Sequence, residues 1–260
     1  MNEPVIDLTS VSAVVFDTDG VVTDTARGHA AAWKHVFDAF LRGRPSAPFD
    51  IRDDYLRHVD GRPRLDGIRT FLGARGITLP EGSPDDEPGA ATVHGLGAAK
   101  DRIFMAQVDK YGVAAFPSTV ALLHELRHRG ARTAAVSASL HGRRLVASAG
   151  VTHLFDLLID GNDAALMDLP GRPDPALLLE AARRLALPAA QVAVVDSALA
   201  GIEAAGKGGF GLVVGVAGDE GGASGTRAES VAAAGAGMVV ADLGEVVVRG
   251  RVPPIPPVAS

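Results

Sequence analysis

The chain has no cysteine among its 260 residues, which excludes disulfides, thiolate zinc sites and cysteine nucleophiles. It also lacks an excess of basic residues, because 25 lysines and arginines stand against 31 acids and give a net charge of −6. This balance gives no electrostatic reason to bind nucleic acid or an anionic membrane. We therefore expect neither as a partner.

The sequence has no hydrophobic run of the length that crosses a membrane. The longest candidate, Val231–Ala241, has about half the length that a membrane helix needs and contains two glycines. The first residues include acids where a signal peptide needs lysine or arginine. We expect a soluble, cytoplasmic protein that is a monomer or a weak homo-oligomer.

The composition is typical of a folded globular protein, with 47% hydrophobic and 22% charged residues. It excludes a disordered chain, a coiled coil and a collagen-like repeat. The length suggests one large domain, or one domain that carries a second, smaller one.

The first part of the chain combines one strand with several helices. An apolar, β-branched run at Ser12–Phe16 predicts a buried strand, and Asp17-Thr18-Asp19-Gly20 predicts the polar turn after it. The region that follows has apolar residues at helical spacing. Helices are predicted at Gly28–Leu41, Arg52–Val59, Arg64–Ala74 and Ala98–Tyr111, with a loop at Pro80–Gly97.

Beyond Pro117 strands alternate with amphipathic helices, a pattern typical of right-handed β-α-β crossovers and a parallel sheet. Strands are predicted at Ala131–Ser137, Leu157–Ile159, Gln191–Val195, Leu212–Val216 and Met238–Val240, and helices at Ser118–Arg129, Arg143–Ala149, Pro175–Leu185 and Leu199–Ala205. The predicted fold class is therefore α/β: a doubly wound, Rossmann-like parallel sheet core with an inserted all-helical cap domain.

The cap divides the core domain in the sequence. We assign residues 1–26 and 114–250 to the α/β core and residues 27–113 to the helical cap. The last ten residues, 251–260, contain four prolines and are predicted to be a disordered tail.

Polar residues lie at the predicted strand ends, where open parallel sheets bind their ligands. These residues are Asp17 and Asp19 after the first strand, Ser137, Ser139 and His141 after the second, Arg172 before a helix, and Asp196 after a later strand. Carboxylates from two strands fit a hard divalent cation, and Mg²⁺ is the one that keeps waters and bridges to phosphate. Hydroxyls and a guanidinium opposite predict a phosphate as the remaining ligand.

Each of these residues also has a plain structural explanation when taken alone. A single aspartate after a strand is most often a turn former or a helix cap. A single arginine is most often a solvated charge, and a serine is most often a loop hydroxyl. The joint pattern, in this order and at these strand ends, favours the catalytic interpretation for Asp17 and Asp19.

The segment Phe16-Asp17-Thr18-Asp19-Gly20-Val21 resembles the first motif of the haloacid dehalogenase superfamily of phosphotransferases. The wider pattern resembles the beta-phosphoglucomutase branch of that superfamily. The segments that carry this second resemblance are Asp17 to Thr25 with His29 and Trp33, Gly61-Arg62-Pro63-Arg64, Val136-Ser137-Ala138-Ser139, and Asp196 to Gly201.

The resemblance implies a role for each residue at the strand ends. Asp17 would be the nucleophile that forms an aspartyl-phosphate. Asp19 would be the general acid and base, while its backbone carbonyl and Asp196 would complete the protein ligands of Mg²⁺. Ser137 and Arg172 would hold the phosphate that is transferred.

The resemblance also implies a second phosphate site and a closing cap. The second, non-reacting phosphate would bind Arg64, Ser139 and the position of His141. The cap would contribute His29, Trp33 and Lys100 to the substrate site, although a lone tryptophan on an amphipathic helix also suits plain packing.

The sequence departs from the family pattern at several positions near this site. Arg172 replaces a lysine, and Val195 replaces the acid that usually precedes the metal-binding aspartate. Leu140 and His141 replace a lysine and an asparagine, and Asp60 replaces a cap lysine. The absence of an acid at position 195 predicts weak magnesium binding, and tighter binding in Val195→Glu unless Arg172 fills the space.

Together these features predict a magnesium-dependent sugar phosphomutase that interconverts the 1- and 6-phosphates of a hexose through an aspartyl-phosphate. One alternative is a phosphatase of a sugar, cyclitol or other small-molecule phosphate. The other is a non-catalytic phosphate-binding homologue, which the intact Asp17, Asp19 and Asp196 disfavour.

Overall fold

The computed structural model describes residues 3–218 and 224–252. Its centre is a six-stranded sheet in the order β4-β3-β2-β5-β6-β7, and every neighbouring pair is parallel. The strands are β2 (Ala13–Asp17), β3 (Arg132–Val136), β4 (Leu157–Ile159), β5 (Val192–Asp196), β6 (Leu212–Val216) and β7 (Met238–Val240). This topology confirms the predicted doubly wound α/β fold.

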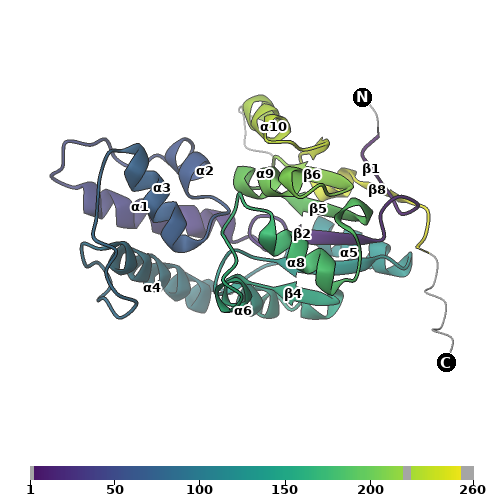
Figure 1. Cartoon of the computed structure of the whole chain (residues 1–260), viewed down its shortest axis with the longest axis horizontal. Coiled ribbons are helices and arrows are strands. Elements are labelled where there is room, and N and C mark those ends of the chain that lie inside the picture. The colour runs from purple at the N-terminus through teal and green to yellow at the C-terminus, as the bar shows by residue number, and fades with distance from the viewer. Residues whose placement is uncertain (1–2, 219–223, 253–260) are drawn as a thin grey trace.

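Helices cover both faces of the sheet (Figure 1). They are α5 (Pro117–His128), α6 (Gly142–Ser148), α7 (Gly161–Leu166), α8 (Ala176–Arg184), α9 (Leu199–Lys207) and α10 (Ser224–Ala233). Short 3₁₀ turns lie at Thr152–Leu154, Ala189–Gln191 and Leu243–Glu245. Because both faces are covered, all five residues of β2 are buried, as expected for a central parallel strand.

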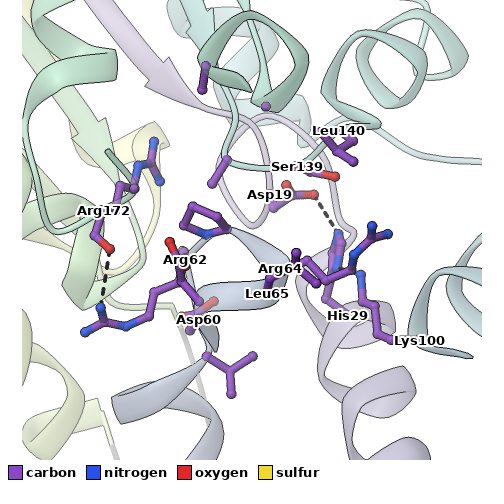
Figure 2. Close-up of a pocket in the computed structure, with 18 of the residues that line it drawn as sticks. Asp19, His29, Asp60, Arg62, Arg64, Leu65, Lys100, Ser139, Leu140 and Arg172 are labelled. Atoms are coloured by element: carbon purple, nitrogen blue, oxygen red, sulfur yellow. Dashed lines mark hydrogen bonds and ion pairs between the residues drawn. The ribbon is translucent and has the colours of Figure 1, made fainter. Parts of the chain in front are cut away.

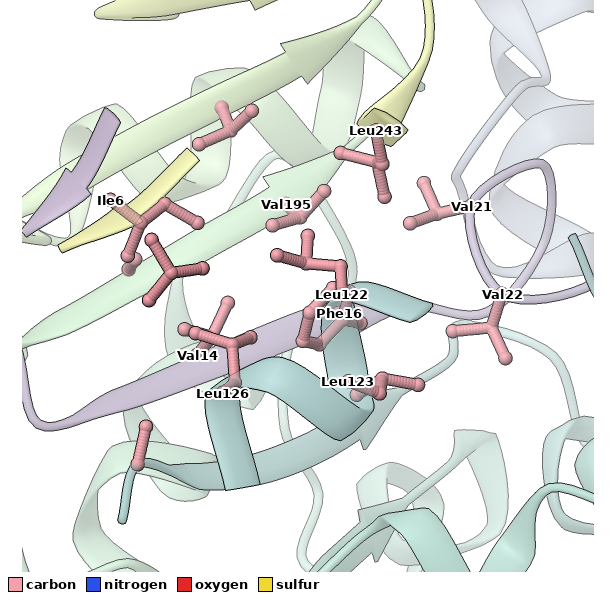
Figure 3. Close-up of a cluster of buried hydrophobic side chains, with 14 of the residues drawn as sticks. Ile6, Val14, Phe16, Val21, Val22, Leu122, Leu123, Leu126, Val195 and Leu243 are labelled. Carbon is pink, nitrogen blue, oxygen red and sulfur yellow. The ribbon is translucent and has the colours of Figure 1, made fainter. Parts of the chain in front are cut away.

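Successive residues of β2 point to two different apolar clusters. Val14 and Phe16 belong to a cluster with Leu122, Leu123 and Leu126 of α5 (Figure 3). Ala13 and Val15 belong to a cluster on the other face, which includes Leu177, Leu178 and Ala181 of α8. This packing fixes the direction of β2 and therefore the point at which its polar turn begins.

The helical part is built from α1 (Ala26–Leu41), α2 (Asp54–His58), α3 (Arg64–Ala74) and α4 (Val93–Tyr111). It lies beside one end of the sheet in Figure 1 and has its own apolar cluster. Aromatic rings form the centre of this cluster, with 4.3 Å between the centroids of Phe37 and Phe71. The division of the chain at residues 26/27 and 113/114 stays a prediction.

Helix α4 begins earlier than the sequence predicted. The composition of residues 93–97 predicts a loop, but Thr92 caps the helix by accepting a hydrogen bond from the backbone N–H of Gly95. Val93 and Leu96 then bury their side chains in the cluster of the helical part. The prolines, glycines and acids before Thr92 concealed this start, although a threonine before an apolar residue is a typical helix signal.

Other elements were missed or differ in length. The strands β1 (Val5–Asp7) and β8 (Val247–Arg249) form a separate parallel pair, and three residues each are too few for a visible alternation. Helices α7 and α10 were not predicted, and α2 covers five residues where Arg52–Val59 was expected. Most of the predicted disordered tail lies outside the described residues.

No helix in residues 3–218 and 224–252 is both long enough and apolar enough to span a membrane.

Candidate active site

A cavity of about 510 Å³ lies between the carboxyl edge of the sheet and the helical part. Strand β2 pairs with β3 on one side and β5 on the other, so the polar residues after all three strands share this edge. Eight of the predicted site residues line the cavity: Asp17, Asp19, His29, Trp33, Arg64, Lys100, Ser139 and Arg172. The other three predicted residues, Ser137, His141 and Asp196, do not line the cavity but contact residues that do.

The turn after β2 depends on Gly20. Its φ of +81° is a left-handed conformation that side-chain-bearing residues rarely adopt, and a Cβ there would lie 2.9 Å from Ser197 Oγ. This close approach brings the loop after β2 against the loop after β5. Ser197 Oγ reaches to within 3.4 Å of the backbone carbonyl oxygen of Asp19.

Arg172 lies between the two carboxylates that end β2 and β5. Its Nη1 is 2.8 Å from Asp17 Oδ1 and 3.2 Å from Asp196 Oδ2. All three side chains are at most 5% exposed. Burial raises the pKa of Asp17, the charge of Asp196 raises it further, and Arg172 offsets part of this effect. The negative charge of the two carboxylates therefore exceeds the positive charge of the one guanidinium between them.

The residues around Asp17 fit a small, hard cation. Asp196 Oδ1 accepts a hydrogen bond from the backbone N–H of Ala198 at 2.8 Å, whereas the buried Oδ2 makes no hydrogen bond and has only its ion pair with Arg172. Among the described residues no three His, Asp or Glu side chains gather as a complete metal site. Two carboxylates and the carbonyl of Asp19 are what the chain offers, and Mg²⁺ is the metal that binds few carboxylates and keeps its waters.

Asp19 is held by hydroxyl groups and by a histidine of α1. Its Oδ1 accepts a hydrogen bond from Thr25 Oγ1 and lies 3.2 Å from His29 Nε2. Ser137 Oγ lies 3.4 Å from the other carboxylate oxygen. Burial raises the pKa of Asp19, but His29 and Thr25 more than offset burial, so this pKa lies well below its usual range. Asp19 is therefore a carboxylate at neutral pH.

A lysine of α4 continues this chain of contacts. Lys100 Nζ lies 2.7 Å from His29 Nδ1 and 4.4 Å from the centre of the Phe104 ring. Burial lowers the pKa of Lys100 to about 7, and burial and Lys100 together lower the pKa of His29. A contact from Lys100 to Nδ1 favours the tautomer of His29 that carries its proton on Nε2, the nitrogen that lies 3.2 Å from Asp19.

Trp33 has both of the roles that the sequence left open. It is 4% exposed and stacks on Phe37 with 5.1 Å between ring centroids, so it is part of the cluster of the helical part. The same side chain lines the cavity, four residues after His29 on the same helix face.

Two of the three residues expected to hold a second phosphate contact an acid that sequence reasoning missed. The guanidinium of Arg64 forms an ion pair with Asp101 of α4, and His141 Nε2 lies 3.3 Å from the same carboxylate oxygen. Ser139 Oγ accepts a hydrogen bond from the backbone N–H of His141 at 3.1 Å. Leu140, which replaces a charged residue of the family pattern, is 42% exposed and lines the cavity. Figure 2 shows Arg64 and Lys100 close together, with Ser139 and Leu140 across the cavity.

The loop between α2 and α3 makes a second contact with the core (Figure 2). Asp60 lies 3.9 Å from Arg227 of α10, and Arg62 donates a hydrogen bond to the backbone carbonyl of Arg172 at 3.3 Å. Burial raises the pKa of Asp60 to about 6, although Arg227 and Tyr55 oppose this rise. The acid at position 60 is thus matched by a basic residue on the core.

The Val195 side chain does not face the cavity. It is fully buried in the apolar cluster between the sheet and α5, which includes Phe16, Leu122 and Leu243 (Figure 3). An acid here would lose these apolar contacts. The structure therefore gives a different expectation for Val195→Glu from the tighter magnesium binding that the sequence suggested.

The comparisons with known proteins agree with this geometry. The family model of haloacid dehalogenase-like hydrolases matches residues 11–209. The chain belongs to this family. It is an enzyme of haloacid dehalogenase type, a family of phosphotransferases that generally use Mg²⁺ and that includes both phosphomutases and phosphatases.

Two curated members of the haloacid dehalogenase family are similar over most of their length. A beta-phosphoglucomutase of Mycobacterium bovis is 37% identical over 241 residues, which is 90% of this chain and 91% of that protein. The beta-phosphoglucomutase of Bacillus subtilis is 29% identical over 197 residues, which is 75% of this chain and 78% of that protein.

Solved structures of the haloacid dehalogenase family have the same fold. The crystal structure of a beta-phosphoglucomutase from Clostridium difficile superposes with a TM-score of 0.66 at 20% identity, over 90% of this chain and 92% of that one. At this identity the likeness concerns the fold alone. The curated relatives carry the more specific similarity.

Proposed function

We propose that this protein is a magnesium-dependent sugar phosphomutase that interconverts the 1- and 6-phosphates of a hexose through an aspartyl-phosphate. The observation that carries this proposal is the arrangement of groups around one cavity. Arg172 and its partner Asp17 lie on one side of the cavity, and Arg64 and Ser139 lie on another. Asp19 lies beside Ser139 and His29 (Figure 2), and His141 contacts both Ser139 and the partner of Arg64. Such a cavity suits a substrate with a phosphate at each end.

Asp17 is the proposed nucleophile. One of its carboxylate oxygens forms a bond to phosphorus, and the bond between phosphorus and the sugar oxygen breaks. Arg172, 2.8 Å from Asp17, and Ser137 hold the phosphate that is transferred. Asp17, Asp196 and the backbone carbonyl of Asp19 would hold Mg²⁺, which would supply positive charge to offset the negative charge of the carboxylates and the phosphate.

Asp19 is the proposed general acid and base. In the forward half-reaction it takes the proton of the sugar hydroxyl while the phosphate leaves Asp17 for that oxygen, and in the reverse it returns the proton. The low pKa of Asp19 means that it is ionised and can accept a proton at the start of that step. His29 and Lys100 orient Asp19 and connect it to the helical part, so its position depends on where that part lies.

The distal phosphate gives the enzyme a way to prefer sugar over water. Arg64 comes from the helical part and His141 from the core, so an anion bound to both draws the two parts together. A phosphoenzyme that becomes reactive only when a distal phosphate has drawn the two parts together transfers its phosphate to a sugar phosphate and not to solvent.

A phosphatase is the second candidate, and one observation favours it. Arg64 and His141 already face Asp101, and Leu140 places an apolar side chain where the family pattern has a charge. Both features reduce the positive charge that a distal phosphate would meet.

Phosphorus NMR of hexose 1-phosphates separates the two candidates. The mixture contains the enzyme, Mg²⁺ and a catalytic amount of the hexose 1,6-bisphosphate. The mutase proposal predicts that the 1-phosphate signal is replaced by a 6-phosphate signal, and only when bisphosphate is present. Accumulation of inorganic phosphate at the same rate with and without bisphosphate would overturn it and support the phosphatase.

A further inference from the structure

Asp101 is an acid in the cavity wall that the proposed chemistry does not use. It extends from α4 of the helical part, and its carboxylate pairs with Arg64 of α3 and lies 3.3 Å from His141 Nε2 of the core. The three side chains are 22–26% exposed, so these contacts are largely shielded from solvent. Asp101 therefore contacts two of the three groups to which the resemblance assigns the distal phosphate.

We propose that Asp101 is an internal counter-ion of the distal anion subsite, which a phosphate on the substrate must displace. Its carboxylate occupies Arg64 and His141 until a second phosphate takes its place. Asp101 is then a specificity-determining residue. A substrate that binds here breaks the ion pair between Asp101 and Arg64, and only an anionic distal group gives Arg64 a new ion pair in its place. This inference rests on the proposed function, since it concerns the same cavity.

The charges around Asp101 support displacement. Lys100, Arg64 and His141 lie together, and Lys100 and Arg64 each lower the pKa of His141 in addition to the effect of its burial. Arg64 is charged at pH 7, whereas the lowered pKa values leave Lys100 partly and His141 largely neutral, so an anion with more than one charge can draw further protons onto these two groups. A phosphate dianion brings more charge and more acceptor oxygens to the same donors, and charge-assisted contacts to phosphate are among the strong ones.

The chemistry of a neutral distal group gives the opposite result. A hydroxyl or an alkyl group cannot compensate Arg64 for a lost carboxylate, and the freed guanidinium would stay partly buried without an anion. Asp101 therefore opposes substrates that lack the second phosphate. Because the Asp101 side chain is 22% exposed, water is available to it once it is displaced.

The alternative role for Asp101 is a permanent brace. In that role its carboxylate would hold Arg64 in the correct orientation for the phosphate, and the two groups would act together. The two roles predict opposite signs for the same substitution. Removing a competing carboxylate strengthens binding of the distal phosphate, whereas removing a brace weakens it.

The test is Asp101→Asn, which keeps the size of the side chain and removes its charge. The probe is glucose 1,6-bisphosphate, titrated calorimetrically with Mg²⁺ into each protein, and p-nitrophenyl phosphate serves as a substrate without a distal anion. We expect the dissociation constant for the bisphosphate to fall about tenfold, as for the loss of one competing ion pair. We expect kcat/KM for p-nitrophenyl phosphate to change less than twofold.

A matched control is Asp109→Asn on the same helix. Asp109 pairs with Arg144 on the surface and is 60% exposed, so its variant should leave both measurements unchanged. Asp101→Ser is a second test variant with the same expected direction. Weaker or unchanged bisphosphate binding in folded Asp101 variants, or equal changes for both probes, would overturn the inference.

The same data keep the inference apart from the proposed function. If the wild-type protein releases inorganic phosphate and forms no 6-phosphate, the mutase proposal fails, yet tighter binding of the bisphosphate to Asp101→Asn would still support the counter-ion role. If the mutase reaction occurs and bisphosphate binding does not strengthen in the variant, the inference alone fails.

Discussion

Lys100→Met tests whether a buried amine of the site loses its proton near neutral pH. Lys100 is 4% exposed and packs against the Phe104 ring, with its Nζ 2.7 Å from His29 Nδ1. Burial lowers its pKa from 10.5 to about 7, Arg64 contributes to the fall, and Asp19 opposes it. A methionine fits the same apolar surroundings and has no charge to desolvate.

The expected effect on stability follows from the two pKa values. The difference between 10.5 in the unfolded chain and about 7 in the folded protein corresponds to about 5 kcal/mol of destabilisation. Below pH 7 both states carry the proton, so the folded state bears this cost in full. Between pH 7 and 10.5 only the unfolded state is protonated, so the stability of the wild type rises with pH. Above 10.5 the cost is gone.

Urea unfolding of the wild type and of Lys100→Met between pH 7 and 10 measures this effect. The advantage of the variant should shrink by up to about 1.4 kcal/mol for each pH unit. Loss of the contact with His29 makes the variant less stable by about 1–3 kcal/mol at every pH, so it does not make the stability difference between the two proteins change with pH. The exposed Lys110 of the same helix provides the matched variant Lys110→Met, which removes an amine at the surface instead of a buried one. A difference between wild type and Lys100→Met that is constant over this range would refute the reasoning.

Three further substitutions test the roles of the carboxylates and of Val195. Asp17→Asn should fold and form no phosphoenzyme with glucose 1,6-bisphosphate by mass spectrometry; turnover near that of the wild type would remove Asp17 as the nucleophile. Asp19→Asn should lower turnover by about 10²–10⁴-fold and keep its affinity for Mg²⁺ in calorimetry, because the proposed ligand is a backbone carbonyl. Val195→Glu should lower the midpoint of thermal unfolding, because it places a carboxylate in an apolar cluster. Unchanged stability together with tighter magnesium binding would show that the new side chain turns toward the cavity.

The sequence was most informative where a site residue directly follows a buried strand. Asp17 and Asp196 end β2 and β5, and strand pairing alone places them at one edge of the sheet. His29 and Trp33 were also within reach, because residues four apart share a helix face, and both line the cavity. The motif indicates which residues belong to the site, and the parallel sheet indicates that they lie close together.

The contacts between the helical part and the core were beyond such reasoning. Asp101 follows Lys100 directly, and nothing in a helical pattern indicates that it reaches His141, which lies 40 residues later in the chain. The match between Asp60 and Arg227 is of the same kind, because it depends on how the helical part meets the core. A departure from a family pattern shows that a charge has changed. Only the folded chain shows which residue pairs with the new charge.

The most direct test of the account is the fate of the phosphoenzyme. The enzyme is labelled with radioactive glucose 1,6-bisphosphate in Mg²⁺, rapidly mixed with or without hexose 1-phosphate, and quenched in acid. We expect a label on the peptide that contains Asp17. It is lost slowly to water and at least tenfold faster to the added sugar phosphate, in keeping with general acid–base help of about 10²–10⁴-fold from Asp19. A label that leaves as inorganic phosphate at one rate in both mixtures, or that never appears on this peptide, would contradict it.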